Sequence, residues 1–107
     1  MEGLELISFK IISAVGMAKS NYIEAMKISE CGNIDLSNEK IQEGDKFLND
    51  AHDVHSELIQ LEASGKSVTP NILLIHAEDQ LISTETIKIM AKEIIKLNKR
   101  ILALENK

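Results

Sequence analysis

The chain has 107 residues, a net charge of −5, and only one Tyr and two Phe among its aromatic residues. This length favours a single domain over residues 1–107, and its core must be aliphatic. The acidic balance argues against a nucleic-acid partner, because such a surface needs clustered basic residues. The lone cysteine, Cys31, excludes an internal disulfide and suits a reducing cytoplasm.

The N-terminal segment carries Glu2 and Glu5 instead of the basic residues that open a signal peptide. Each long apolar run is interrupted by charge well short of the length of a membrane span. We therefore expect a soluble, cytoplasmic protein with no direct membrane insertion.

The first predicted helix covers residues 4–30. Its apolar residues recur every three or four positions, which predicts an amphipathic helix. They are Leu4, Ile7, Ile11, Ala14, Ala18, Ala25 and Ile28. Gly32 and Asn33 follow this seam and are typical of the end of a helix.

A second helix is predicted over residues 37–64, with Ser37 or Asn38 capping its start. Its buried face has the same spacing. It consists of Ile41, Leu48, Ala51, Val54, Leu58 and Leu61. Residues 64–66 end this helix, and an extended connector reaches Pro70, because the residue before a proline disfavours helix.

The third predicted helix, residues 71–103, carries two apolar stripes. The first is Leu73, Ala77, Leu81, Ile87, Ala91, Ile94 and Ile101, and the second is Ile72, Ile75, Asp79, Ile82, Thr86 and Ile89. One stripe is enough to pack a helix inside a bundle, so the second predicts burial against another copy of the chain. Because no segment alternates like a strand, the predicted fold is all-α, an antiparallel three-helix bundle.

Two ionisable residues, His76 and Asp79, stand in this apolar segment of the third helix. A neutral imidazole is a nucleophile that can accept and return a phosphoryl group, and the dipole near a helix start favours added negative charge. Taken alone, His76 fits a structural histidine better. A carboxylate at Asp79 is costly to bury unless it is paired, protonated or bound to metal, and a surface aspartate is the alternative.

Residues 74–81 (LIHAEDQL) resemble the signature of the enzyme IIA component of the lactose/cellobiose (N,N'-diacetylchitobiose) branch of the bacterial phosphoenolpyruvate-dependent sugar phosphotransferase system. Further matches lie at residues 16–20, 25–26 and 32–34, and the resemblance covers nearly the whole chain. It implies a homotrimer, a nine-helix bundle. It also implies that His76 is the phosphoacceptor and that Asp79 holds Mg²⁺, or another divalent cation, at the trimer axis.

The resemblance further implies a phosphoryl relay. The histidine-containing phosphocarrier protein would donate to His76, and His76 would pass the group to a cysteine of enzyme IIB. Enzyme IIC would then carry a disaccharide of the cellobiose, chitobiose or lactose type through the membrane as it is phosphorylated. The alternative is a non-catalytic helical interaction module, which explains the stripes but not the histidine and aspartate among them.

The chain departs from the family pattern at three positions. The family often has Gln and His where this chain has Glu78 and Gln80, and Gln is usual at His55. His52 and His55 could share a helix face, but the Glu-x-x-His spacing of a ferritin-like metal enzyme is missing. We interpret these two histidines as structural or solvated, and Cys31 as incidental, since no adjacent cation activates it.

Overall fold

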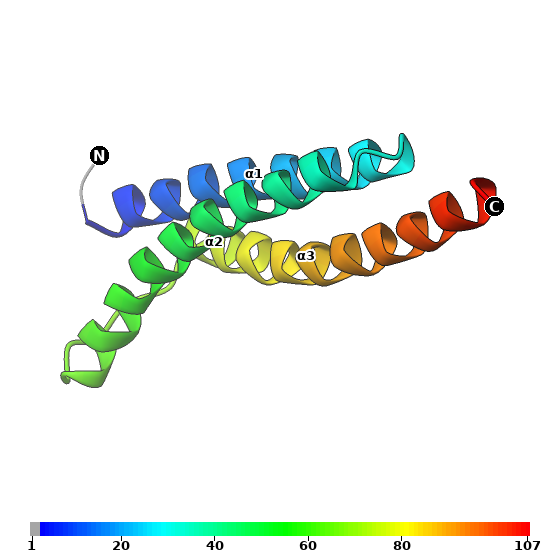
Figure 1. The fold of residues 1–107 in the computed structure, drawn as a ribbon. Helices are drawn as coiled ribbons and strands as arrows, with labels where there is room; N and C mark the ends of the chain where they lie inside the picture. Colours follow the sequence, from blue (N-terminus) through cyan, green and yellow to red (C-terminus); the bar gives the residue numbers. More distant parts are fainter. Residues whose placement is uncertain (1–2) are drawn as a thin grey trace.

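A computed structural model describes residues 3–107 as three helices joined by two short connections (Figure 1). α1 covers Gly3–Glu30, α2 covers Ile34–Ala63 and α3 covers Ile72–Glu105. This range contains no strand, which confirms the predicted all-α class. None of its helices combines the length and the hydropathy that a bilayer span requires. Glu2 lies outside the described residues.

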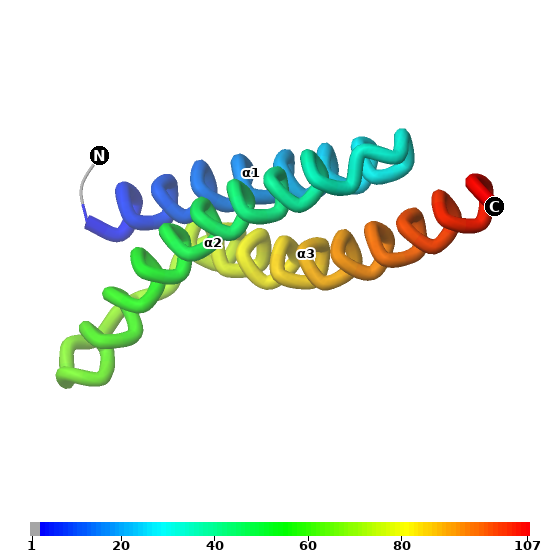
Figure 2. Tube along the Cα trace, in the orientation of Figure 1, coloured from blue at the N-terminus to red at the C-terminus, as the bar shows by residue number. Residues whose placement is uncertain are grey.

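The bundle is elongated, with extents of 61 × 23 × 20 Å. α1 packs along both other helices, whereas α2 and α3 meet over a much smaller area. Figure 2 shows the reason. The C-terminal part of α2 diverges from the other two helices, and the C-terminal end of α3 extends beyond the α1–α2 connection. α1 is therefore the helix around which the bundle is organised.

The α1–α2 connection differs from the sequence prediction. Asn33 caps α2, and its side chain accepts a hydrogen bond from the amide of Leu36 at 3.1 Å. The helix thus begins at Ile34, and the prediction that Ser37 or Asn38 caps it was wrong. Gly32 adopts a φ of +92°, which reverses the chain directly after α1 and leaves Asn33 as the first residue placed to cap.

Ser37 is instead a buried residue inside α2. Its hydroxyl donates a hydrogen bond to the carbonyl oxygen of Ala25 at 2.7 Å, and so ties the start of α2 to α1. The start of α3 follows the usual capping rule, because the side chain of Asn71 accepts a hydrogen bond from the amide of Leu74 at 2.8 Å.

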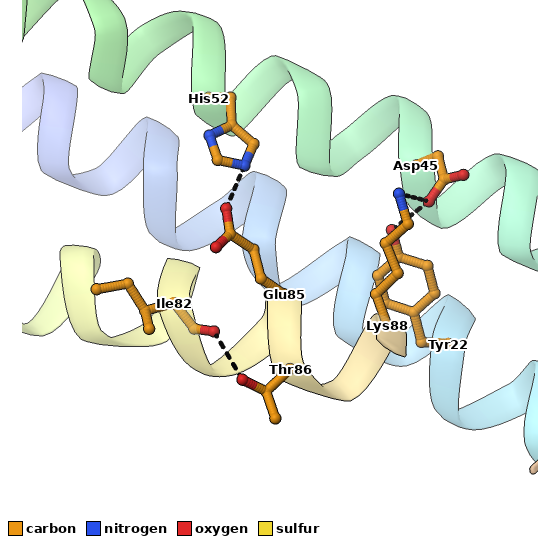
Figure 3. Close-up of polar contacts among 7 residues, drawn as sticks. All are labelled: Tyr22, Asp45, His52, Ile82, Glu85, Thr86 and Lys88. Atoms are coloured by element: carbon orange, nitrogen blue, oxygen red, sulfur yellow. Dashed lines mark hydrogen bonds and ion pairs between the residues drawn. The ribbon is translucent and has the colours of Figure 1, made fainter. Parts of the chain in front are cut away.

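The core is aliphatic except for one aromatic ring, that of Tyr22. The residues of this core are Ile11, Val15, Ala18, Tyr22, Ala25, Ile41, Leu48, Ala51, Ala77, Leu81, Ala91 and Ile95. The Tyr22 hydroxyl donates to Oδ1 of Asp45 at 2.6 Å, and Nζ of Lys88 lies 3.0 Å from the same oxygen (Figure 3). We call these three residues the clasp, because they join α1, α2 and α3. Burial, and then the carboxylate of Asp45, raise the pKa of Tyr22 well above its ordinary value.

Replacing Gly44 with Ala is expected to destabilise the chain by about 1–2 kcal/mol. The new Cβ would lie 2.7 Å from Cε1 of the Tyr22 ring, which is buried and held by the clasp. Overpacking of this kind costs roughly 1–3 kcal/mol, partly offset by the better helix propensity of Ala. Urea unfolding would measure the change. Gly16→Ala is the matched control, because its Cβ meets nothing within 4 Å and it should raise stability.

Thr84 offers a stabilising change. Its side chain is fully buried in α3, and its hydroxyl has no hydrogen-bond partner in the described part of the chain. A buried polar group without a partner costs roughly 1–3 kcal/mol. Thr84→Val keeps the shape and removes the hydroxyl, so the free energy of unfolding should rise by about 1 kcal/mol. A lower urea midpoint for this variant would show that the hydroxyl is satisfied.

Candidate functional site

His76 lies in the second turn of α3, five residues after the capping Asn71, and its side chain is exposed. The histidine rings that form hydrogen bonds or ion pairs within residues 3–107 are those of His52 and His55, so the ring of His76 makes none there. The exposed ring is thus not engaged by another group of the described residues. The structure therefore places His76 on an accessible surface near the start of α3.

Asp79 lies one turn after His76, exposed between Ile75 and Ile82. We call this exposed side of α3 the outward face. Its large apolar residues are far more exposed than core residues: Ile72 is 85% exposed, Ile75 57%, Ile82 64% and Ile89 63%. The first predicted stripe is buried or half-buried except for Ile101, which is 51% exposed, and the buried face of α3 also includes Leu74, Thr84 and Ile95, which the prediction left out. The second stripe is left uncovered within the chain. A large exposed apolar surface of this kind, here around one carboxylate, is typical of a site that binds another molecule.

The outward face also carries Thr86. Its hydroxyl donates to the carbonyl oxygen of Ile82 at 3.5 Å, a long contact within the helix (Figure 3). Within residues 3–107, no three His, Cys, Asp or Glu side chains lie close enough together to hold a metal ion. A single copy therefore presents the Asp79 carboxylate alone. An oxygen ligand of this type suits Mg²⁺ when several copies supply it together.

His52 and His55 pair separately with two glutamates of α3. Nε2 of His55 lies 2.7 Å from Oε2 of Glu78, and Nε2 of His52 contacts Oε1 of Glu85 (Figure 3 shows the latter pair). Each histidine has its own carboxylate, so the structure does not bring the two together as metal ligands. Both pairs join α2 to α3 where these helices make few other contacts, which agrees with a structural role.

The His55–Glu78 pair joins two of the positions at which the chain departs from the family pattern. Sequence reasoning treated these departures separately, because nothing in helical spacing shows which residues of two different helices meet. A histidine and a glutamate that both replace uncharged residues, on helices expected to pack together, were the signal that could have revealed the pair. The third departure, Gln80, is half-buried one turn after His76.

His76 and the α2 histidines lie on different sides of α3. Successive residues of an α-helix are about 100° apart around its axis, so His76 and Glu78 are about 200° apart. Because Glu78 points to α2, His76 points away from α2. The chain on its own therefore gives His76 no second histidine as a neighbour.

These observations define a small helical-bundle protein that carries its candidate nucleophile on an open helix face and not in an enclosed cavity. A family model described as the lactose/cellobiose-specific IIA subunit of the phosphotransferase (PTS) system matches residues 6–99. The chain belongs to this family, which confirms the resemblance found in residues 74–81.

Individual relatives agree with the family match. The chain is 37% identical to the lichenan-specific phosphotransferase enzyme IIA component of Bacillus subtilis (strain 168), over 94% of this chain and 91% of the relative. It is 27% identical to the lactose-specific EIIA component of Lacticaseibacillus casei, over 99% of this chain and 95% of the relative. Both alignments span nearly the full length of each protein.

Solved structures show the same architecture. The crystal structure of the PTS cellobiose-specific enzyme IIA from Bacillus anthracis superposes with a TM-score of 0.91 at 35% identity, and covers 96% of this chain and 95% of that one. PtcA from S. mutans superposes with a TM-score of 0.87 at 34% identity, and covers 92% of this chain and 99% of the other. The chain is thus a sugar-specific enzyme IIA component of the lactose/cellobiose type, with that three-helix fold.

Proposed function

We propose that this protein is a phosphoryl carrier, which receives a phosphoryl group on His76 from the histidine-containing phosphocarrier protein and delivers it to a cysteine of enzyme IIB. The observation that carries the proposal is the exposed ring of His76, whose nitrogens form no hydrogen bond within residues 3–107. A relay residue has to meet two proteins in turn, so an open helix face serves it better than a cavity.

The chemistry consists of two in-line displacements at phosphorus. In the first, a ring nitrogen of His76 uses its lone pair to form an N–P bond while the N–P bond of the donor phosphohistidine breaks. In the second, the thiolate of enzyme IIB forms an S–P bond while the bond to His76 breaks. The position of His76 near the start of α3 favours the charge that the phosphoryl group adds. No nucleotide or sugar enters either step.

The outward face supports a homotrimer as the working form. Its isoleucines gain burial only against another molecule, and threefold symmetry would bring three Asp79 carboxylates together at one point. Three like charges repel, and Mg²⁺ or another divalent cation ligated by these carboxylates and water would offset the repulsion when bound. Asp79 fits this role because it is exposed at the centre of the apolar face and forms no ion pair within residues 3–107.

The transported sugar is a disaccharide of the cellobiose, chitobiose or lactose type. Relatives with nearly full-length matches are named for lichenan, for an oligo-beta-mannoside and for lactose, and a similar solved structure is named for cellobiose. In the proposed relay, enzyme IIC carries the sugar through the membrane as it is phosphorylated, and the present chain acts on the cytoplasmic side without touching the sugar.

Intact-mass measurement tests the proposal. The protein is incubated with phosphoenolpyruvate, enzyme I and the phosphocarrier protein, and a gain of one acid-labile phosphoryl group per chain is expected. Subsequent addition of enzyme IIB should remove it. No gain, in a mixture that phosphorylates another enzyme IIA, would instead support a non-catalytic helical interaction module, which the uncovered outward face by itself would equally serve.

A further inference from the structure

The charges of α3 are divided between its two halves. Residues 72–86 carry three acidic residues and no lysine or arginine, whereas residues 88–100 carry five basic residues and one acidic residue. The chain as a whole has a net charge of −5, and yet five of its 12 Lys and Arg residues fall in this short segment. They are Lys88, Lys92, Lys96, Lys99 and Arg100.

The spacing of these basic residues is unfavourable for the helix itself. Lys88, Lys92, Lys96 and Arg100 follow one another at intervals of four, and like charges four residues apart in a helix repel each other. The helix dipole favours basic residues only in the last turn, whereas α3 continues to Glu105, well beyond most of them. A negative charge from outside the helix would relieve this repulsion.

α2 neutralises the first of these residues but not the next ones. Nζ of Lys88 lies 3.0 Å from Oδ1 of Asp45 (Figure 3). Lys92 and Lys99 form no ion pair within residues 3–107, and Lys96 reaches only a glutamate of its own helix in an exposed pair. Exposed pairs of this kind contribute little. Three lysines of α3 therefore receive no carboxylate from α1 or α2.

Lys92, Lys96 and Lys99 line one cavity between α2 and α3, and we call them the lysine strip. Around the axis of α3 they lie within about 60° of one another, and along the axis they span about 10 Å. The cavity has a volume of about 300 Å³, and no carboxylate is among the described residues that line it. Its other lining residues are Ile34, Asn38, Ile41 and Ile95.

The floor of this cavity is apolar. Ile41 and Ile95 belong to the core and are each 6% exposed. Ile34 is half-buried and is the first residue of α2, so the positive end of that helix dipole lies beside the cavity. The cavity thus combines an apolar floor with a positively charged rim.

This combination favours one class of ligand. A phosphate monoester carries a charge of about −1.5 to −2 and three strong acceptor oxygens, which several compact ammonium groups can share, whereas a carboxylate carries a single charge. An isoleucine floor favours an apolar group over a sugar ring, because buried hydroxyl groups would lose their hydrogen bonds to water. The volume is at the lower end of the range for ligand sites, so this group must be small.

We propose that the cavity between the start of α2 and the lysine strip binds a small phosphate monoester with an apolar organic group. The lysines hold the phosphate, and the isoleucines of the floor contact the organic group. Lys92 lies about 24 Å along α3 from His76, so this site is separate from the phosphoacceptor. The inference rests neither on the proposed relay nor on its trimer.

Phenyl phosphate is a suitable probe, because it joins a phosphate to one apolar ring. In a titration followed by amide resonances, the residues that shift should be those of the first two turns of α2 and residues 92–99. Inorganic phosphate, glucose 6-phosphate and benzoate are the comparison compounds, and each lacks either the apolar ring or the second charge. Each should bind at least about fivefold more weakly than phenyl phosphate.

Two triple variants separate the lysine strip from net charge. Substitution of all three strip lysines with Gln should weaken phenyl phosphate binding by about tenfold or more. The control variant is Lys10→Gln with Lys19→Gln and Lys46→Gln, which removes the same charge from exposed lysines outside the cavity. Its affinity should change by less than about twofold, because salt screens charges at that distance.

Stability gives a second measurement. Bound phenyl phosphate should raise the urea midpoint of the wild type and of the control variant, but not that of the variant without the lysine strip. Substitution of the strip also removes the like-charge neighbours of α3, so this variant is expected to fold, and circular dichroism checks this.

The outcomes decide each part of the inference. Equal losses in the two triple variants, or no binding of phenyl phosphate at about 10 mM, would overturn the site. Tighter binding of glucose 6-phosphate than of phenyl phosphate would overturn the assignment of an apolar organic group. The relay is measured separately, by intact mass, and its failure would leave this inference standing.

Discussion

Replacement of His76 with Ala is expected to abolish phosphoryl gain while it leaves the fold unchanged. The side chain is exposed and makes no hydrogen bond within residues 3–107, so its removal costs no packing and should shift the free energy of unfolding by less than about 0.5 kcal/mol. In the proposed relay, in contrast, both phosphoryl transfers take place on the His76 ring. Intact mass after incubation with the donors measures the effect.

The other two histidines are the natural comparison for this loss. His52→Ala and His55→Ala should both still gain one phosphoryl group. If His76→Ala kept the full gain, the acceptor would be one of the α2 histidines. The relay would then begin at a histidine bonded to glutamate, not at the exposed ring that makes no hydrogen bond within residues 3–107.

Replacement of Asp79 with Leu is expected to make the assembly independent of divalent cations and more stable. In the proposed trimer the change removes three mutually repelling carboxylates and buries three apolar side chains, each worth about 1.5–3 kcal/mol. Sedimentation at several protein concentrations, with and without a chelator, measures the association. Wild-type trimers should weaken when the chelator removes the cation, and Asp79→Leu trimers should not.

Thr86→Leu is the matched control for this change. Thr86 lies seven residues after Asp79 on the same exposed face, so the substitution also adds apolar surface to the proposed interface. It should strengthen association but keep the effect of the chelator. Unchanged binding of the cation to Asp79→Leu protein, measured by calorimetry, would show that the metal site lies elsewhere.

Much of the fold could be predicted because it depends on periodic apolar residues. The spacing of these residues predicted most of the buried face of each helix, but Leu61 and Ile101, expected on covered faces, are 39% and 51% exposed. The two stripes of the third segment predicted that one would remain uncovered by its own chain. The residue at which a helix starts depends on the N-cap, which the apolar periodicity does not show. Asn33, Ser37 and Asn38 all suit an N-cap, and the choice among them is made by the turn at Gly32.

Contacts between polar residues of different helices were the main features missed. Nothing in the helical spacing indicated that Asp45 and Lys88 would meet the hydroxyl of Tyr22. The pairing of His55 with Glu78 was missed for the same reason, since the two are 23 residues apart on separate helices. The candidate site could be proposed from the sequence because His76 and Asp79 are close in sequence and belong to a specific family motif.

The clasp gives the molecule a built-in optical reporter. Tyr22 is the only tyrosine and there is no tryptophan, so intrinsic tyrosine fluorescence arises from the point where the three helices are joined. Far-ultraviolet circular dichroism, in contrast, averages over every helical turn. Unfolding curves that coincide for the two signals would show that the helices unfold only when they separate. A change in fluorescence at lower denaturant would show that the helices remain folded after the bundle has come apart.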